Sequence, residues 1–312
     1  MINRLHRRRI LLLALVVIVL GIVIFTGSYR DNVSGSLPEL DVSRDGVPVL
    51  AYHFFREGNS IERTLRSIGT VLLNLPLIPP KNDWTISAKT FEKHLQYLQE
   101  NGYETITLRD LVDYMRGEIE LSGKCVVITF DDGDESVYRY AYPLLKKYGM
   151  KGTLFLITSK VGQVWSDLTL SASYEFREMQ RSEVIDIESH THDLHYKIMR
   201  GKYPHPAFML LDDDSSPHEI NEVFDDLKKS RLMIERLFRT ESAFLAWPFG
   251  FGSTLADSLA REAGFEGIVT LESGANMKGE SPYTIRRYTI TARTSMRIFR
   301  EMVAARHGPP EV

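Results

Sequence analysis

The chain lacks two features that would narrow its function class at once. It has a single cysteine, Cys125, and its charges nearly balance, with 38 Lys and Arg against 41 Asp and Glu. A lone thiol excludes an intrachain disulfide framework, and its apolar surroundings predict a small core residue. Nucleic-acid-binding proteins carry a basic excess, so nothing here indicates a nucleic-acid partner.

Charge is also missing from Ile10 to Phe25, an apolar run near the N-terminus. Four arginines precede it: Arg4, Arg7, Arg8 and Arg9. A signal-peptide core has about 7–15 apolar residues and a spanning helix about 17–25, so the run lies at the boundary. No Ala-x-Ala-like cleavage site follows it. We therefore expect residues 1–27 to form a basic segment and a single-pass transmembrane anchor, with secretion after signal cleavage as the alternative. The arginines predict that the rest of the chain lies outside the cytoplasmic membrane.

Residues 28–46 are polar and aperiodic and are expected to be a linker, and residues 47–312 are long enough for one large α/β domain. In that domain, apolar runs typical of strands alternate with helical periodicity, which predicts a parallel sheet closed or nearly closed into a barrel. The expected strands are 47–52, 105–107, 124–130, 152–157, 184–189, 243–247, 267–270 and 288–290. The expected helices are 87–101, 108–115, 137–148, 173–179, 219–238, 255–263 and 295–305. Residues 54–86 and 201–217 interrupt this order, either as walls of a groove or as ordinary surface insertions.

Two polar segments follow expected strands. Asp131-Asp132-Gly133 comes after 124–130, and His190, His192 and His195 come after 184–189. Asp-Asp-Gly by itself is most often a turn. Together, however, the carboxylates and the histidines form a donor set for a divalent ion, placed at the strand ends where α/β proteins build their sites.

A family resemblance rests on these residues. In chain order, residues 129–133, the histidine cluster and residues 246–250 resemble three signature motifs of the polysaccharide deacetylases with a NodB homology domain, carbohydrate esterase family 4. The framing segments 49–53, 91–103 and 141–149 agree, so that the resemblance covers most of residues 47–290. It implies the irregular (β/α) barrel of that family. The third motif departs from the usual pattern, since Ala246 stands where most members have an arginine.

The resemblance implies a ligand set of Asp132, His190 and His195. In most members the second histidine follows the first by four residues, where this chain has Leu194, which cannot bind a metal. The branch of biofilm poly-N-acetylglucosamine deacetylases has the longer spacing, which favours His195. His192 stays an alternative, because residues i and i+2 of an extended segment face the same side. The implied metal is divalent, most simply zinc, although cobalt and nickel suit the same ligands.

Further roles follow from the resemblance. Asp131 corresponds to the catalytic base, and the backbone N–H of Phe249 to a donor to the oxyanion. The late histidine that usually serves as the acid is missing, and the biofilm branch resembles a circular permutation that brings its strand first, so the acid is assigned to His53. Arg287 resembles an arginine that orients the base. Trp247 and Phe249 are candidate sugar contacts, with a core position as the alternative for Trp247.

The expected protein is thus a metal-dependent N-deacetylase of an N-acetylhexosamine polysaccharide. A peptidoglycan deacetylase or an O-acetyl esterase would use the same site. A carbohydrate-binding or scaffold protein with a degenerate site is the alternative from another class, favoured by Ala246 and by the missing late histidine. The sequence indicates neither the polymer and its linkage nor an oligomeric state.

Overall fold

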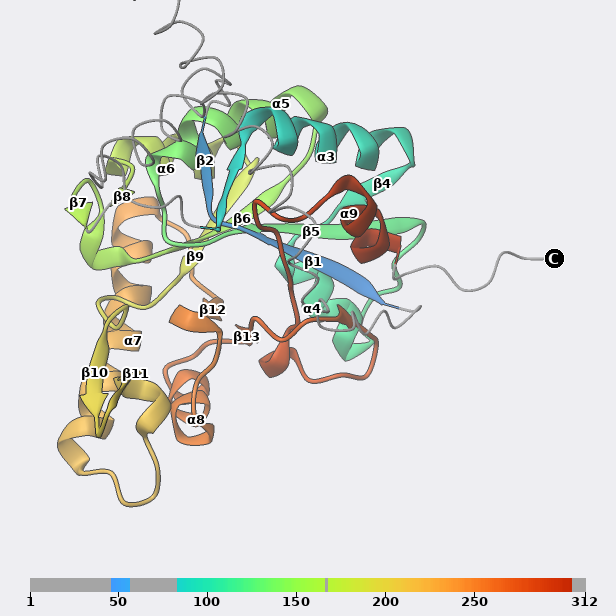
Figure 1. Ribbon diagram of the computed structural model, residues 1–312. Coiled ribbons are helices and arrows are strands. Elements are labelled where there is room, and N and C mark those ends of the chain that lie inside the picture. The colour runs from blue at the N-terminus through green and yellow to red at the C-terminus, as the bar shows by residue number, and fades with distance from the viewer. Residues whose placement is uncertain (1–45, 57–82, 166–167, 305–312) are drawn as a thin grey trace, which may run out of the picture. The chain divides into compact units, whose positions relative to one another are not determined.

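The computed structural model describes residues 46–56, 83–165 and 168–304. Their centre is a curved sheet in which six strands run parallel in the order β13-β12-β9-β6-β5-β1, with β14 antiparallel beside β1 (Figure 1). The strands of this path are β1 (Val47–Tyr52), β5 (Lys124–Phe130), β6 (Gly152–Leu156), β9 (Ile185–Ser189), β12 (Phe244–Ala246), β13 (Gly267–Val269) and β14 (Ala275–Asn276). Two more strands, β4 (Tyr103–Thr105) and β15 (Tyr288–Thr289), pair with β5 and β1.

The sheet forms a half-barrel whose two edges are joined by the segment 285–289. Ile285 pairs with Val269 next to β13, and β15 runs parallel to β1 through Tyr288 and Leu50. The expected parallel α/β barrel is therefore present in this open form.

Helices form the outer layer: α3 (Ala88–Glu100), α4 (Leu108–Arg116), α5 (Tyr142–Tyr148), α6 (Ser173–Arg181), α7 (Pro217–Phe238), α8 (Thr254–Glu262) and α9 (Met296–Val303). Neighbours in this layer pack on one another, α3 on α5, α6 on α7, and α7 on α8. Capping residues determine where these helices begin and end. The Ser87 hydroxyl accepts a hydrogen bond from the N–H of Thr90 and begins α3, and Gly117, with φ 78°, ends α4 in the left-handed region.

Strand β5 is buried on both faces, as its apolar sequence predicts. On one face Cys125 and Val127 join a core cluster with α4. On the other, the Phe130 ring lies 5.9 Å from the ring of Tyr52 and 6.0 Å from that of Phe91. A strand clamped in this way holds the residues that follow it in fixed positions.

On the side that faces β9, the start of β12 is not paired with a strand, and a buried carboxylate accepts its hydrogen bonds instead. Only Leu245 of β12 pairs with β9, through Ser189. Oε2 of Glu188 accepts hydrogen bonds from the N–H groups of Ala243 and Phe244, each at 2.9 Å. These donors would otherwise be buried without an acceptor.

The structure departs from the expected elements in three places. Residues 137–148 divide into a π-helical turn, Val137–Ala141, and α5, with Pro143 in the first turn of α5 where no N–H is needed. Phe54–Arg56 and Thr85–Ser87 are strands β2 and β3, which pair in parallel. Short hairpins also went unpredicted, because two- to four-residue strands carry little periodicity.

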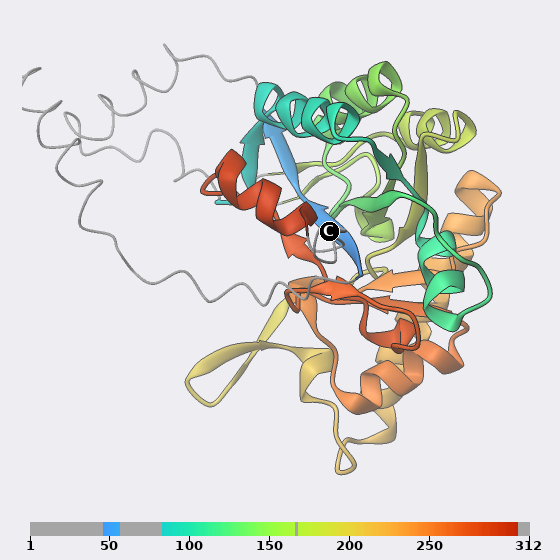
Figure 2. The same ribbon diagram turned by 90° about the vertical axis from the view of Figure 1, so that its right-hand side faces the viewer.

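One of these hairpins lies partly within the expected loop 201–217. It consists of β10 (Lys197–Arg200) and β11 (Tyr203–Pro206), is followed by a 3-10 turn at Ala207–Leu210, and projects from the body of the domain (Figure 2). The other hairpin is β7 (Val164–Trp165) with β8 (Leu168–Thr169).

The expected anchor at 1–27, the linker at 28–46 apart from Gly46, and most of the interruption at 54–86 lie outside the described residues. Among the residues that are described, no helix has both the length and the apolar character needed to cross a membrane.

Candidate active site

The carboxyl ends of β5 and β9 deliver the two motifs to one place. The sharp turn after β5 puts Asp132 at φ 73° and Gly133 at φ 93°, both in the left-handed region. Thr191, directly after His190, has φ 69°. A non-glycine residue is strained in this region, and such strain is concentrated at functional sites. The backbone is therefore bent at both motifs so that the side chains meet.

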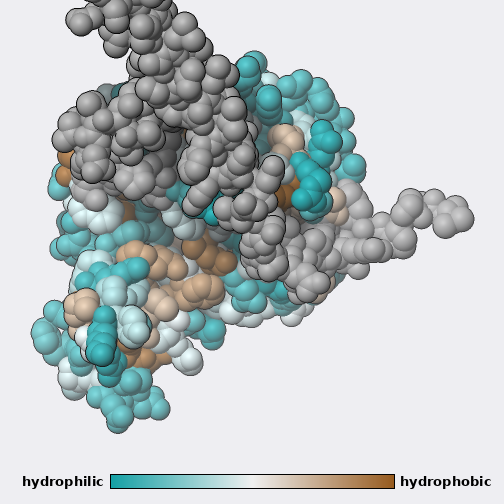
Figure 3. Space-filling model, viewed as in Figure 1, coloured by the Kyte–Doolittle hydropathy of each residue, from teal (hydrophilic) through white to brown (hydrophobic). Residues whose placement is uncertain are grey.

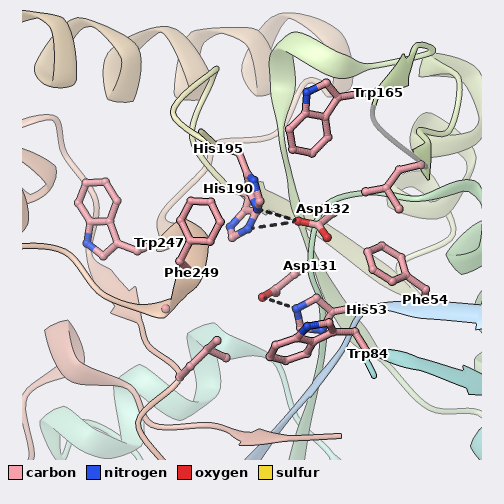
Figure 4. A pocket seen from close by; sticks show the side chains of 13 residues that line it. His53, Phe54, Trp84, Asp131, Asp132, Trp165, His190, His195, Trp247 and Phe249 are labelled. Atoms are coloured by element: carbon pink, nitrogen blue, oxygen red, sulfur yellow. Dashed lines mark ion pairs between the residues drawn. The ribbon is translucent and has the colours of Figure 1, made fainter. Parts of the chain in front are cut away.

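Asp132, His190 and His195 form a compact donor group. The Oδ1 atom of Asp132 lies 3.5 Å from Nε2 of His190 and 3.4 Å from Nε2 of His195. One ligand atom from each of the three residues lies within 4.8 Å of the others. Figure 4 shows the three side chains turned toward one another.

The orientation of His190 suits a metal ligand. Its Nδ1 lies 2.7 Å from the carbonyl oxygen of Ala246, which can only accept a hydrogen bond. Nδ1 therefore carries the hydrogen, and in the neutral ring Nε2 keeps a lone pair that faces Asp132. A backbone carbonyl in this position is the usual partner of a ligating imidazole. The donor set and its orientation thus fit a divalent ion such as zinc.

The loop after His190 determines which further histidine faces the site. Its amides at His192 and Asp193 donate to the two carboxylate oxygens of Asp226 on α7, at 2.7 and 2.8 Å. Nδ1 of His192 lies 2.9 Å from the hydroxyl of Thr158, away from the donor group. The next turn brings His195 back to Asp132. The longer spacing is thus a loop held by α7, and it is His195, not His192, that the structure places beside His190.

Asp131 is held by a buried arginine. Arg287 donates from Nη1 to Oδ1 at 2.7 Å and from Nη2 to Oδ2 at 2.9 Å. Nε of Arg287 donates to the carbonyl of Thr270, so the guanidinium is fixed. Burial raises the pKa of Asp131, but Arg287 and the neighbouring histidines outweigh it and hold that pKa below its usual value. The third motif has Ala246 where most family members have an arginine. In this structure Arg287, from the segment 285–289, brings a guanidinium to the site.

His53 comes from the end of β1, the strand next to β5. Its Nε2 lies 3.8 Å from Oδ2 of Asp131, and its ring packs on Trp84 with 4.4 Å between centroids. Burial is the largest influence on His53 and lowers its pKa. Of the described residues, none offers a hydrogen-bond partner to its Nδ1. His53 is thus next to the expected base, on the side away from Phe249 (Figure 4).

These groups line a cavity of about 300 Å³. Aromatic side chains form much of its wall: Phe54, Trp84, Trp165 and Phe249. The rings of Trp165 and Phe249 pack on His195, with centroids 5.1 and 4.6 Å away. A polar centre within an aromatic wall is typical of sites that bind sugar rings.

Comparisons with known proteins agree with this geometry. The polysaccharide deacetylase family pattern matches residues 118–268, a span that contains Asp131, Asp132, His190 and His195. Residues 118–268 form a polysaccharide deacetylase domain. Members of this family hydrolyse carbon–nitrogen bonds of amides, so the protein is a hydrolase of that class. His53 and Arg287 lie outside the matched span.

Comparisons with individual relatives and solved structures show that the similarity covers most of the deacetylase. It is 25% identical to the poly-β-1,6-N-acetyl-D-glucosamine N-deacetylase of Staphylococcus aureus strain N315 over 288 residues, 92% of this chain and 93% of the relative. The structure of IcaB from Ammonifex degensii superposes with a TM-score of 0.68 at 28% identity, covering 84% of this chain and 98% of that one. A de-N-acetylase from Aggregatibacter actinomycetemcomitans shares the fold, with a TM-score of 0.68 at 23% identity, covering 83% and 100%.

Trp247 of the deacetylase takes the core position, which was the alternative to a sugar contact. The residue is 1% exposed, its ring stacks on Phe208 at 4.7 Å, and its Nε1 donates to Asp257. Trp247 is among the residues that line the cavity, but an indole enclosed in this way has almost no surface left for stacking on a sugar. Phe249 is 36% exposed, and its φ of 62° is left-handed. It is therefore the exposed aromatic of the third motif.

Sequence patterns do not assign three residues that line this site or hold its loop. Trp84 and Trp165 lie in segments without a strong helical or strand pattern, and Asp226 lies on a helix far along the chain. Asp226 had a detectable signal, because it is an acidic residue between Val223 and Leu227 on the buried face of α7. For Trp84 and Trp165 the sequence carries no such signal, because single tryptophans in irregular segments have no pattern that assigns them to a site.

Proposed function

We propose that the protein is a metal-dependent N-deacetylase that removes acetyl groups from an N-acetylhexosamine polymer outside the cytoplasmic membrane. The observation that carries the proposal is the donor group Asp132, His190 and His195 directly beside Asp131 and His53. The name of the Staphylococcus aureus relative makes a β-1,6-linked N-acetylglucosamine polymer the first substrate to test.

The three donors would hold the metal, and the bound ion would supply Lewis acidity toward the amide carbonyl and the attacking water. Asp131 takes a proton from that water as a general base, since its carboxylate borders the donor group and is kept ionised by Arg287. His53, on the other side of Asp131, donates a proton to the departing nitrogen. The new C–O bond forms first and gives a tetrahedral oxyanion, and the C–N bond then breaks as the nitrogen takes its proton, which gives acetate and a free amine.

Acetate release tests the proposal. The purified protein is incubated with β-1,6-linked N-acetylglucosamine oligomers, chito-oligosaccharides and peptidoglycan side by side, before and after chelation and readdition of zinc. We expect release from the β-1,6 oligomers that is lost on chelation and restored by zinc, and an Asp131→Asn variant that still binds zinc but releases no acetate. Full activity of that variant, or release that chelation does not affect, would overturn the mechanism.

We further propose that residues 1–27 anchor the chain with the catalytic domain outside. The support is the arginine cluster before an uncharged apolar run in the sequence. Cell fractionation with protease treatment of intact spheroplasts tests this. Recovery of a protease-protected domain in the cytosol would contradict it.

A further inference from the structure

A lysine lies over the outer wall of the site. Strand β10 begins at Lys197, two residues after His195, and the Nζ of Lys197 lies 4.5 Å from the centroid of the Phe249 ring. That ring in turn packs on His195 at 4.6 Å. The first residue of the projecting hairpin therefore brings a positive charge to the ring of Phe249, which lines the cavity.

A second lysine, Lys160, also lies over an aromatic ring that lines the cavity, but its charge is paired. Lys160 lies 5.9 Å from the ring centroid of Trp165, the other aromatic neighbour of His195, but its Nζ is also 2.6 Å from a carboxylate oxygen of Asp193. No carboxylate of the described residues lies within ion-pair distance of Lys197. Lys160 is therefore paired with a carboxylate, whereas no carboxylate of the described part of the chain compensates Lys197.

The aromatic ring explains why Lys197 stays in this place. A cation over a ring face is attracted by the ring quadrupole even at an exposed site. Around it, the hairpin is mixed in character, with Ile198, Met199 and Tyr203 exposed beside hydrophilic residues (Figure 3). The hairpin thus presents an apolar, cationic surface next to the site.

The proposed reaction changes the charge of its own substrate. Each turnover replaces a neutral acetamide by an amine, which is protonated in mildly acidic solution. A sugar unit next to the reacting one would lie beside Phe249 and Lys197. Coulomb repulsion between two unit charges about 8 Å apart corresponds to roughly 2-fold discrimination in a water-like medium and roughly 30-fold near a protein surface.

We infer that Lys197 is a specificity-determining residue that disfavours sugar units whose neighbour already carries a free amine. The enzyme then deacetylates units within acetylated stretches, so that the product retains spaced acetyl groups. This inference rests on the proposed N-deacetylase function and assigns the charge preference of the same site.

Two defined oligomers test it: a fully N-acetylated β-1,6-linked pentamer and the same pentamer with one free amine next to the central unit. Acetate release is measured at pH 6.5 and low salt with the full-length protein, and kcat/KM is compared. Wild type should prefer the acetylated pentamer by at least about 2-fold. Lys197→Met should reduce the ratio to about 1, and Lys197→Glu should invert it. Added salt should weaken the wild-type preference, because it screens exposed charges.

Lys228 provides a matched control. It lies 5.2 Å from the ring centroid of Phe224, also as an exposed lysine over an aromatic ring, but lines a different hollow on α7 with Arg231 and Leu232. Lys228→Met should leave the ratio unchanged. An unchanged ratio in both Lys197 variants, or an equal loss of kcat/KM on both pentamers, would overturn the inference and leave Lys197 a structural support of Phe249.

A binding measurement separates this inference from the proposed function. Fluorescence of the site tryptophans reports binding of the fully deacetylated, cationic pentamer without turnover. If Lys197→Glu binds it several-fold more tightly than wild type while no variant releases acetate, the charge preference stands and the proposed activity falls. If acetate is released but the Lys197 variants bind the cationic pentamer as wild type does, the activity stands and the inference falls. Neither binding nor release would overturn both.

Discussion

Replacing Arg287 by methionine should destabilise the protein strongly, because it leaves a buried carboxylate without its partner. Asp131 is 2% exposed and Arg287 1% exposed, and two hydrogen bonds of 2.7 and 2.9 Å join them. Removal of one member of such a buried pair costs about 3–5 kcal/mol of unfolding free energy, because the remaining charge is desolvated and uncompensated. Methionine has a similar length, so little of this loss comes from an empty cavity.

Urea denaturation of the purified protein, followed by tryptophan fluorescence, measures this loss. The double variant Arg287→Met with Asp131→Asn should recover part of the stability, since it buries no unpaired carboxylate. Arg286→Met is the matched control: the neighbouring Arg286 pairs with Glu280 in a more exposed position, where an ion pair contributes about 0–1 kcal/mol. A loss below about 1 kcal/mol for Arg287→Met, or a double variant less stable than that single variant, would refute the reasoning.

Three further predictions concern other residues. His195→Ala should weaken zinc binding at least about 10-fold in a chelator competition, whereas His192→Ala should not; equal effects would contradict the ligand set. Asp226→Asn leaves one loop N–H without an acceptor, so we expect a loss of about 1–3 kcal/mol and weaker zinc binding, and unchanged values of both would show that the loop needs no clamp. Burial lowers the pKa of His94 to about 4, below the 6.5 of the unfolded chain. The neutral His94 side chain therefore makes its full contribution to the free energy of unfolding above pH 6.5, and this contribution is lost as the pH falls toward 4. His94→Leu should remove roughly 2 kcal/mol of this pH dependence between pH 7 and pH 4.5 in a denaturation series, and identical profiles for the two proteins would contradict it.

His94 also shows where sequence periodicity misled. By sequence, His94 falls on the polar side of helix α3, which predicts a solvent-exposed position, but the residue is fully buried. Its ring stacks on Phe299 at 3.9 Å, and its Nδ1 lies 3.1 Å from the hydroxyl of Tyr52. Helix α9, from the end of the chain, covers that face of α3. A helical pattern identifies the face toward the sheet, but it does not reveal a second covering element.

The sequence by itself determined the elements that depend on local chemistry. The apolar run 124–130 became β5 with the same bounds, and helix α3 begins and ends within one residue of its expected limits. The family motifs also placed Asp131, Asp132 and His190 at strand ends, because parallel strands bring their carboxyl ends to one edge.

Only the tertiary structure decided the contacts between distant segments. Register between β1 and β5, with Tyr52 opposite Phe130, brings His53 to Asp131. The segment 285–289, which spans the open side of the sheet, carries Arg287 to the same carboxylate, and α7 brings Asp226 to the loop that positions His195. Periodicity records which side of an element is buried but not which residue it meets. Those pairings follow from how the sheet curves and closes.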